Sequence, residues 1–300
     1  MNFESIVNLY RSPWRTSLHI LAQRRPSWLF SNYVRLARRQ GLTQPGLILS
    51  FDCDTDLDAE IAEQVTEQLI SSAVYPVFAV PGRNLERHPE IFRKILEWGC
   101  EFINHGYAEH AYWNSELDRY ESCTFYNQLS PDEVAEDIRR GHETIVAVLG
   151  EAPCGFRAPH FGAYQERRQR WFLHNTLHDL GYRYSTSTVP AFGFVHGPVS
   201  RVTSNLVEIP VSGCFDSPLL ILDSWGFFDA RHDRHTPGDY REQFIKMIDF
   251  FATRQIPGLL NFYVDPSHIA GRNEFFDAID HAVNRIYILR NYQEVIAVDE

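Results

Sequence analysis

The segment Gly46-Leu-Ile-Leu-Ser-Phe-Asp-Cys-Asp-Thr-Asp56 carries the strongest fold signal in the chain. Its first six residues form a short apolar run, which is typical of a buried strand. Three aspartates follow at positions 52, 54 and 56, and from residue 56 to 72 the apolar residues recur at helical spacing. The sequence therefore predicts a buried strand, an acidic turn and a helix, in that order.

The same alternation of strand and helix continues along the chain. Ser130-Pro-Asp-Glu133 is its clearest helix start, because serine caps a helix, proline suits the first turn and Glu133 completes a capping box. Alternating elements favour an α/β fold with a parallel sheet, and their number and length suit a barrel. We predict further strands at about 74–80, 100–104, 154–157, 182–187 and 258–264, and helices at about 88–98, 130–149, 164–180, 238–254 and 273–291.

The composition is that of a soluble globular protein. The 300 residues are 44% hydrophobic and 22% charged, and no apolar run approaches the roughly 18 residues of a membrane-spanning helix. We find no export signal, and the five cysteines form no CxxC pair, so we predict a cytoplasmic protein with reduced thiols. The net charge of −11 argues against a nucleic-acid partner, and no glycine-rich nucleotide-binding motif is present.

Side chains that can carry chemistry follow several of the predicted strands. In a parallel barrel such groups collect at the carboxyl ends of the strands, so we expect them to share one rim. Carboxylate and imidazole ligands together suit Zn²⁺ or a similar cation with one position open to water. Each group also has a structural interpretation as a helix cap, a local hydrogen-bond partner or half of an ion pair. The groups are the aspartates of 52–56, His105, His110, Arg157, and Asp265-Pro-Ser-His268.

Four segments resemble the motifs of one family. They are Ser50-Phe-Asp-Cys-Asp54, His105-Gly-Tyr-Ala-Glu-His110, Phe156-Arg-Ala-Pro-His-Phe-Gly162 and Leu206-Val-Glu-Ile-Pro-Val-Ser212. Over residues 46–300 the chain thus resembles the polysaccharide deacetylases, also called the NodB-homology family or family 4 carbohydrate esterases. The resemblance implies a distorted (β/α)7 TIM-like barrel that removes N- or O-acyl groups from sugars with a divalent metal ion.

The resemblance also implies a role for each motif residue. Asp52 would be the general base and Asp54 a metal ligand together with His105 and His110. Arg157 would orient the base through a bidentate pair, and the backbone after Pro159 would help to form the oxyanion site. The expected metal is Zn²⁺, with Co²⁺, Ni²⁺, iron or Mn²⁺ as alternatives.

Two motifs depart from the family pattern. The motif histidines, His105 and His110, lie five positions apart instead of four, and Glu109 occupies the strict position, so Glu109 is an alternative ligand. The family's last motif supplies a histidine acid, whereas here Asp265 stands in that place and His268 follows three residues later. Either residue is a candidate proton donor. Asp223-Ser-Trp225 is a weak match to the preceding motif.

Aromatic residues are frequent near these motifs. The segment 107–126 reads as a long polar and aromatic loop, whose rings either stack on a sugar or pack the loop onto the barrel. The residues predicted to contact substrate are Tyr107, Trp113, Pro159, His160, Phe161 and Trp225.

The N-terminal residues 1–45 form a basic, helix-rich extension before the barrel domain of residues 46–300. Since the extension has a charge of +6 and the whole chain −11, the remainder carries −17. One interpretation is an interfacial helix on an anionic membrane, and the other is a helical extension docked on the barrel with its arginines paired to acidic groups. An oligomer is compatible with either.

Together these observations predict a metal-dependent hydrolase that removes an N-acyl group, expected to be acetyl, from an amino sugar. The predicted cytoplasmic location favours a nucleotide- or lipid-linked glycan precursor as substrate. Two alternatives stand beside this hypothesis: an allantoinase-like amidohydrolase acting on a small non-sugar amide, and a catalytically degenerate barrel that binds glycans.

Overall fold

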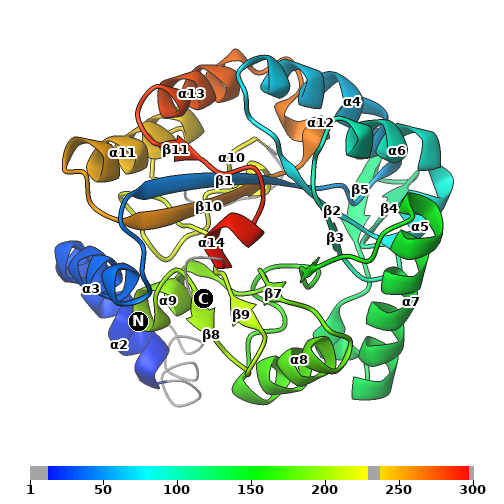
Figure 1. Cartoon of the computed structure of the whole chain (residues 1–300), viewed down its shortest axis with the longest axis horizontal. Helices are drawn as coiled ribbons and strands as arrows, with labels where there is room; N and C mark the ends of the chain where they lie inside the picture. The colour runs from blue at the N-terminus through cyan, green and yellow to red at the C-terminus, as the bar shows by residue number, and fades with distance from the viewer. Residues whose placement is uncertain (1–12, 229–236, 297–300) are drawn as a thin grey trace.

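The computed structural model describes residues 13–228 and 237–296, and its centre is a curled sheet (Figure 1). Strand β1 (Pro45–Asp52) is buried along its whole length and pairs in parallel with β10 (Gly258–Val264) and β2 (Val77–Val80). The order is β10-β1-β2-β3-β6-β7-β9-β8, and β11 (Tyr287–Ile288) also pairs with β1. The remaining strands are β3 (Phe102–Asn104), β6 (Gly155–Phe156), β7 (Tyr184–Ser185), β9 (Val207–Glu208) and the antiparallel β8 (Ser200–Arg201).

The opening of the sheet beside β10 is bridged by irregular chain. The backbone N–H of Ser212 donates to the carbonyl of Asn261 over 2.7 Å. The amide of Asn261 donates to the carbonyls of Ile209 and Pro210 over 3.2 and 3.1 Å. The residues after β9 therefore bring the two sides of the curled sheet together, which produces the distorted barrel that the sequence predicted.

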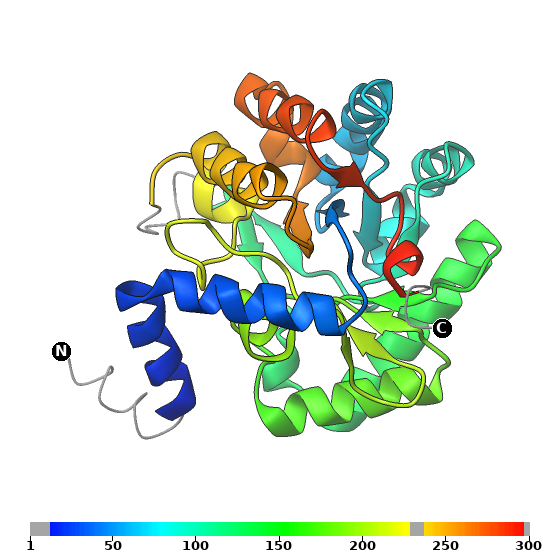
Figure 2. The ribbon, with the colours of Figure 1, turned by 60° about the vertical axis from the view of Figure 1, so that its left-hand side comes forward.

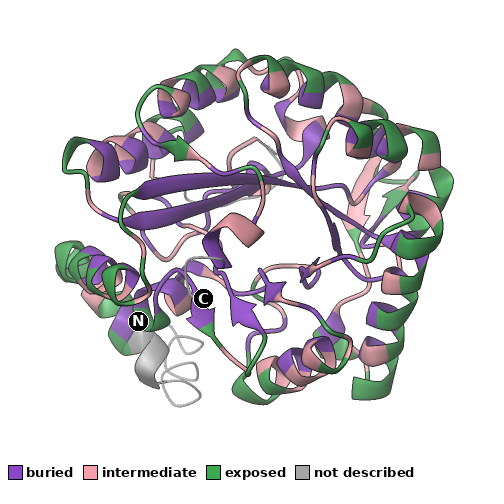
Figure 3. Ribbon diagram, viewed as in Figure 1, coloured by how far each residue is buried: buried purple, intermediate pink, exposed green. Residues whose placement is uncertain are grey.

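Helices surround the sheet, with buried inner faces and exposed outer faces (Figure 3). The capping box predicted at Ser130 and Glu133 is present, and Gly150 ends that helix in the left-handed conformation. The outer helices are α4 (Asp56–Ser71), α5 (Gly82–Arg87), α6 (Pro89–Glu97), α7 (Pro131–Leu149), α8 (Arg167–Asp179), α11 (Tyr240–Thr253) and α13 (Asn273–Val283). The shorter helices are α9 (Pro190–His196), α10 (Ser224–Phe228), α12 (Pro266–Ile269), α14 (Gln293–Ile296) and the 3₁₀ turn η1 (Tyr126–Gln128). Within the described part of the chain, no helix is both long and apolar enough to cross a membrane.

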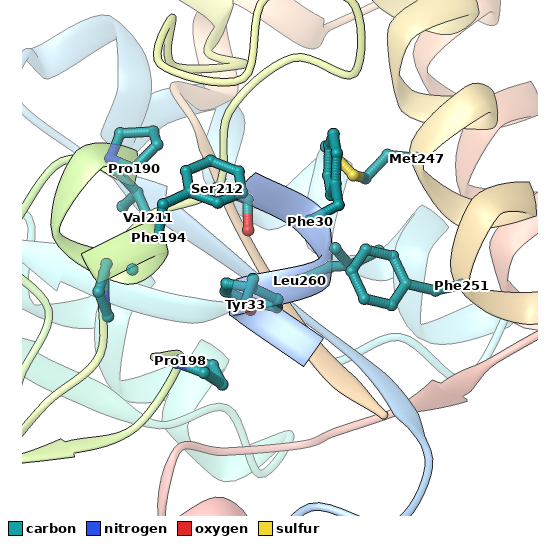
Figure 4. Close-up of a pocket in the computed structure, with 12 residues that line it drawn as sticks. Phe30, Tyr33, Pro190, Phe194, Pro198, Val211, Ser212, Met247, Phe251 and Leu260 are labelled. Atoms are coloured by element: carbon teal, nitrogen blue, oxygen red, sulfur yellow. The ribbon is translucent and has the colours of Figure 1, made fainter. Parts of the chain in front are cut away.

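The N-terminal extension contains α2 (Pro13–Arg24) and α3 (Pro26–Arg39), and α3 lies along the barrel (Figure 2). Phe30 is buried, and its ring centroid lies 5.5 Å from that of Phe194 and 4.9 Å from that of Phe250. Figure 4 shows Phe30 and Tyr33 facing Met247 and Phe251, and only about 30 Å³ of free space remains there. Hydrogen bonds join this packing, since the side chains of Asn32 and Gln40 donate to the carbonyls of Phe194 and His196 over 2.7 Å each. Among described side chains, no arginine of the extension is ion-paired with a carboxylate, and Arg35 donates instead to Asn32. Residues 1–12 lie outside the described part.

Two of the predicted segments have a different secondary structure from the one expected. The predicted loop 107–126 contains an antiparallel hairpin of β4 (Ala111–Asn114) and β5 (Arg119–Ser122). The predicted helix 273–291 ends at Val283, and the chain returns to the sheet as β11, where the N–H of Leu289 donates to the carbonyl of Leu47. The hairpin forms by pairing across a turn, and β11 forms by pairing with the distant strand β1. The local spacing of apolar residues does not predict either kind of pairing.

Candidate metal centre and active site

The strand ends bring the predicted functional groups to one rim. Asp52 is the last residue of β1, His105 directly follows β3, and Arg157 directly follows β6. Since β1, β2, β3 and β6 are neighbours in a parallel sheet, their carboxyl ends meet at the same edge. Asp265 follows β10 on the other side of β1.

Asp54, His105 and His110 form a cluster in which one ligand atom from each residue lies within 4.8 Å of the others. Asp54 Oδ1 is 3.4 Å from His105 Nε2 and 3.1 Å from His110 Nδ1. His105 Nδ1 is 2.7 Å from the carbonyl oxygen of Arg157, which can only accept, so Nδ1 carries the proton and Nε2 is free to bind a cation. One carboxylate and two imidazoles are a donor set that suits Zn²⁺ with positions left for water.

Glu109, the alternative ligand, lies outside this cluster. Its carboxylate is ion-paired with Arg87, and its backbone carbonyl accepts from Cys123. The extra residue in the motif is accommodated at Gly106, whose φ of 80° is open to glycine and unfavourable for other residues. The Asp137 carboxylate then holds the loop by accepting from the N–H groups of Tyr107 and Ala108 over 3.2 and 2.8 Å. His110 thereby reaches the position that the strict spacing assigns to Glu109.

Arg157 is fully buried and pairs with Asp52. The contact joins Nη1 to Asp52 Oδ1, while Nη2 donates to the Ser50 hydroxyl over 2.8 Å and to the Tyr292 hydroxyl over 3.0 Å. The predicted bidentate pair is therefore wrong, because two hydroxyls occupy the second amino group of the guanidinium. This leaves Asp52 Oδ2 directed at the cluster, 3.8 Å from His105 Nε2.

Burial and charge act in opposite directions on the ionisable groups of the cluster. For Asp54, burial raises the pKa, but His110 and His105 outweigh it and hold the pKa well below the usual range. For His105, burial lowers the pKa, but the carboxylates of Asp52 and Asp54 raise it above its usual value. Burial and the neighbouring His110 lower the pKa of His160. The arrangement thus concentrates negative charge where a cation would bind.

An open pocket of about 160 Å³ lies over the cluster. His160, one of its lining residues, adopts a left-handed backbone with φ of 55°, which is strained for a residue with a side chain. Its ring stacks on Phe125 at 4.3 Å, and its Nε2 lies 2.6 Å from the carbonyl of Cys123, so both contacts support this turn after Pro159. The pocket is lined by Asp52, Asp54, His110, Ala111, Ser122, His160, Phe161, Trp225 and Tyr263.

Three of the predicted substrate contacts, Tyr107, Trp113 and Pro159, do not line this pocket. The ring of Tyr107 packs against Arg140 of α7 at 3.7 Å, and its hydroxyl donates to Glu86. Trp113 lies on the hairpin, where it is half exposed and packs on Tyr120 with ring centroids 5.1 Å apart. Tyr107 thus packs its loop onto the outer helices, whereas Phe161 and Trp225 face the pocket.

The candidate acids form a separate hydrogen-bonded group. Asp265 Oδ2 accepts from the Ser224 hydroxyl over 2.6 Å, and His268 Nδ1 lies 3.2 Å from that hydroxyl and 3.4 Å from Asp265 Oδ2. Burial raises the pKa of Asp265 to about 7, although its hydrogen bond with His268 lowers it. The described lining of the pocket contains neither acid. It contains Trp225, whose ring meets that of His268 edge-on at 4.8 Å.

Sequence reasoning missed several supporting residues. Ser50 and Asn261 are polar residues inside apolar strand segments. Because a buried polar group needs a hydrogen-bond partner, their positions could have predicted a buried polar network. Tyr292 and Asp137 gave no such signal, because each lies far along the chain from the group it holds. Ser224, which joins the two candidate acids, was quoted only as part of a weak motif.

The sequence was compared with family models and with curated proteins. Residues 40–185 match the family model of the polysaccharide deacetylases. No curated protein has a sequence that matches the chain.

Solved structures share the barrel over most of the chain. A protein assigned as a polysaccharide deacetylase from Mycobacterium smegmatis is 20% identical with a TM-score of 0.57, over 86% of this chain and 91% of that one. Another from Pseudomonas aeruginosa PAO1 is 12% identical with a TM-score of 0.61, over 84% and 89%. The allantoinase Puue is 11% identical with a TM-score of 0.60, over 85% and 90%.

At these identities the structures demonstrate the fold alone, and they confirm the predicted (β/α)7-type barrel. The match over residues 40–185 contains three of the four motif segments, with the Asp54, His105 and His110 cluster and the Asp52–Arg157 pair. Over residues 40–185 the chain therefore matches the polysaccharide deacetylase family, as the sequence motifs predicted, and it shares the barrel of solved structures assigned to that family.

Proposed function

We propose that the protein is a metal-dependent hydrolase that removes an N-acyl group, acetyl in the first instance, from an amino sugar carried on a glycan precursor. The observation that carries this proposal is the juxtaposition of two units at the floor of one pocket. Asp54, His105 and His110 form the cation site, and Asp52, held by the buried Arg157, directs its second oxygen at that site.

The three clustered residues would hold the cation, with Zn²⁺ expected and Co²⁺, Ni²⁺, iron or Mn²⁺ as alternatives. When bound, such a cation lowers the pKa of water and polarises a carbonyl group. The chain itself fixes the ligands. The Arg157 carbonyl sets the tautomer of His105, and the edge-on contact between the His105 and His110 rings, 4.4 Å between centroids, restricts both rings.

Asp52 acts as the general base. Arg157 holds Oδ1 in place, so Oδ2 is the oxygen that accepts the proton of the attacking water. We assign the oxyanion site to backbone N–H groups of the turn at His160, because His160 and Phe161 both line the pocket. Phe161, Trp225 and Tyr263 supply aromatic faces for a sugar ring.

The leaving amine takes its proton from the group formed by Asp265, Ser224 and His268. The Asp265 pKa of about 7 gives this group a proton to share near neutral pH, and the Ser224 hydroxyl connects the carboxyl with the imidazole. We assign the donor to His268, because it is the member that contacts Trp225 at the pocket wall.

Metal content and hydrolysis test the proposal together. The purified chain should carry one equivalent of divalent metal and release acetate from N-acetylated amino sugars, and Asp54→Ala should lose both. Asp56→Asn is the matched control, because Asp56 lies two residues away and pairs with Arg87 and His88 outside the cluster. A wild-type chain that binds no metal would favour the degenerate glycan-binding barrel instead.

An allantoinase-like activity is the second candidate, and the shared barrel of Puue is the observation behind it. Assaying the same protein on cyclic ureides separates the two. If the protein hydrolyses a ureide and releases no acetate from sugars, the proposed sugar substrate is wrong, whereas the proposed metal site still stands.

Contact with an anionic membrane and a cytoplasmic location remain predictions. Ile20 and Trp28, on α2 and α3, are 49% and 67% exposed, and Arg24 and Arg25 lie between them in the chain. Apolar side chains beside arginines suit an anionic lipid surface. We expect the protein to sediment with anionic vesicles more than with neutral ones, and Trp28→Ala to reduce that fraction. Equal sedimentation with both kinds of vesicle would count against the contact.

A further inference from the structure

A second cavity of about 350 Å³ adjoins the catalytic pocket, and nothing in the proposed chemistry uses it. Phe161 lines both spaces. The walls are mostly apolar and come from separate segments: Leu18 of α2, Val189 and Ala191 at the start of α9, and Leu219, Leu220 and Ile221 before α10. The described polar lining is limited to His19 and Gln165, so it includes no carboxylate, lysine or arginine.

The boundary between the two spaces is a packed apolar cluster. Phe161 lies against Tyr263 with ring centroids 4.6 Å apart, and both residues pack with Val211, Ile221 and Val189. Tyr263 faces the catalytic pocket, while Val189 and Ile221 face the cavity. The two spaces therefore share Phe161 as a wall, and the described side chains packed with it at their boundary are apolar or aromatic.

The sizes of the two spaces indicate how a substrate divides between them. Small-molecule sites span roughly 300–1,000 Å³. At about 160 Å³ the catalytic pocket falls below that range, whereas the cavity at about 350 Å³ falls within it. Apolar walls of a surface cavity are unfavourable when they contact only water. We therefore expect an apolar ligand to cover them.

We propose that the cavity binds a hydrocarbon group of the substrate, so that the substrate is an amphiphile with its amide at the metal cluster. This inference rests on the proposed function and names the substrate class. It disfavours a nucleotide-linked sugar, because a nucleotide phosphate would find no cationic side chain in the described lining. The hydrocarbon is attached either through the sugar or through the acyl group, and both share this chemistry.

Two substrate series test the inference and separate the attachments. The first is alkyl glycosides of N-acetylglucosamine from methyl to octyl, and the second is methyl glucosaminides with N-acyl groups from acetyl to octanoyl. Each buried methylene is worth about three- to fourfold, so kcat/KM should rise at least about tenfold along one series. The series that responds identifies the attachment. A flat response in both, with the methyl glycoside still hydrolysed, overturns the inference and leaves the proposed function intact.

Ala191→Trp should abolish that rise by filling the cavity, while the methyl glycoside keeps its kcat/KM within about twofold. Val195→Trp is the matched control, since Val195 is 40% exposed on the same helix and is not part of the cavity lining. Leu219→Asn makes the cavity polar without filling it and covers the case in which the tryptophan variant fails to fold. A rise that persists in both cavity variants overturns the inference.

A binding measurement keeps this inference separate from catalysis. Isothermal titration with octyl glucoside, below its micelle concentration, should show one site in the wild type and in Asp54→Ala, and none in Ala191→Trp. Binding without any sugar deacetylation would refute the proposed function and support the cavity. Absence of binding to the wild type would overturn the cavity assignment.

Discussion

The early and late halves of the barrel rim are built differently. In the early half, Asp52, His105 and Arg157 leave the ends of regular parallel strands, and each is buried. In the late half, only Asp265 follows a regular parallel strand, β10, whereas Ser224 and His268 come from the short helices α10 and α12, and His268 contacts the pocket wall through the ring of Trp225. The family match, at residues 40–185, also covers the early half and stops before the late one.

The difference shows how strand register fixes chemistry. Asn104 of β3 pairs with Phe156 of β6, so the next residues, His105 and Arg157, are neighbours by register alone. The late group depends instead on one hydroxyl, Ser224, which accepts from the Asp265 N–H and donates to its carboxylate. We therefore expect changes in the early half to have large effects and changes in the late half smaller ones.

Asp52→Asn should produce the largest effect. Removing the base should lower kcat by about 10³- to 10⁴-fold, while metal binding persists because Asp54, His105 and His110 remain. Metal content and kcat on the same preparation check this. Asp56→Asn should retain near-wild-type activity. A kcat for Asp52→Asn within tenfold of the wild type would remove Asp52 from the role of base.

Arg157→Met should produce the largest loss of stability. It leaves the Asp52 carboxylate buried without its cationic partner, which costs about 3–5 kcal/mol. Arg139→Met is the control, because Arg139 pairs with Glu136 and Glu143 on an exposed helix face, where solvent screens the charges, so its loss should change stability little. Urea unfolding of both variants decides the point. Equal losses would show that the buried pair has no special structural role.

The same contrast explains what the sequence could predict. The early half was readable because its apolar runs mark the strands and the polar residue after each run marks the rim. The sequence left two candidates, His110 and Glu109, for the third metal ligand. The choice between them depends on the left-handed backbone of Gly106 and on Asp137 from a distant helix, which the spacing of residues does not show. A spacing rule counts residues, whereas a loop conformation decides which residue faces inward.

The sequence also did not predict which side chains pack against distant segments of the chain. Tyr107 and Trp113 have the composition of a sugar platform, yet Tyr107 packs under Arg140 and Trp113 lies on a hairpin whose pairing is antiparallel. The sequence of the extension 1–45 is basic, but its described docking uses Phe30 and Val34 in the main apolar core and hydrogen bonds from uncharged side chains such as Asn32. Charge counts and ring counts carry no information on which side of an element meets a partner.

His268→Ala should lower kcat by about 10²-fold, less than the loss from Asp52→Asn, since the leaving amine can still draw a proton slowly from water. His281→Ala is the control, because His281 pairs with Asp249 on the outer helices. Asp265→Asn should lower kcat less than His268→Ala if the aspartate acts through the imidazole. Unchanged kcat in both variants would place the proton donor within the early half of the rim.

The smallest effect is a dependence of stability on pH that belongs to the late half. Since burial raises the pKa of Asp265 to about 7, above the ordinary value of an aspartate, the folded chain holds a proton there that the unfolded chain has released. Its contribution to stability is therefore complete at acidic pH and is lost as the pH rises towards 7, by at most about 1.4 kcal/mol per pH unit. In Asp265→Asn the amide does not titrate, so the difference in unfolding free energy between wild type and variant should shrink or reverse from pH 5 to 7. We would measure it by urea unfolding without added metal, and parallel pH curves for the two proteins would show that Asp265 titrates normally.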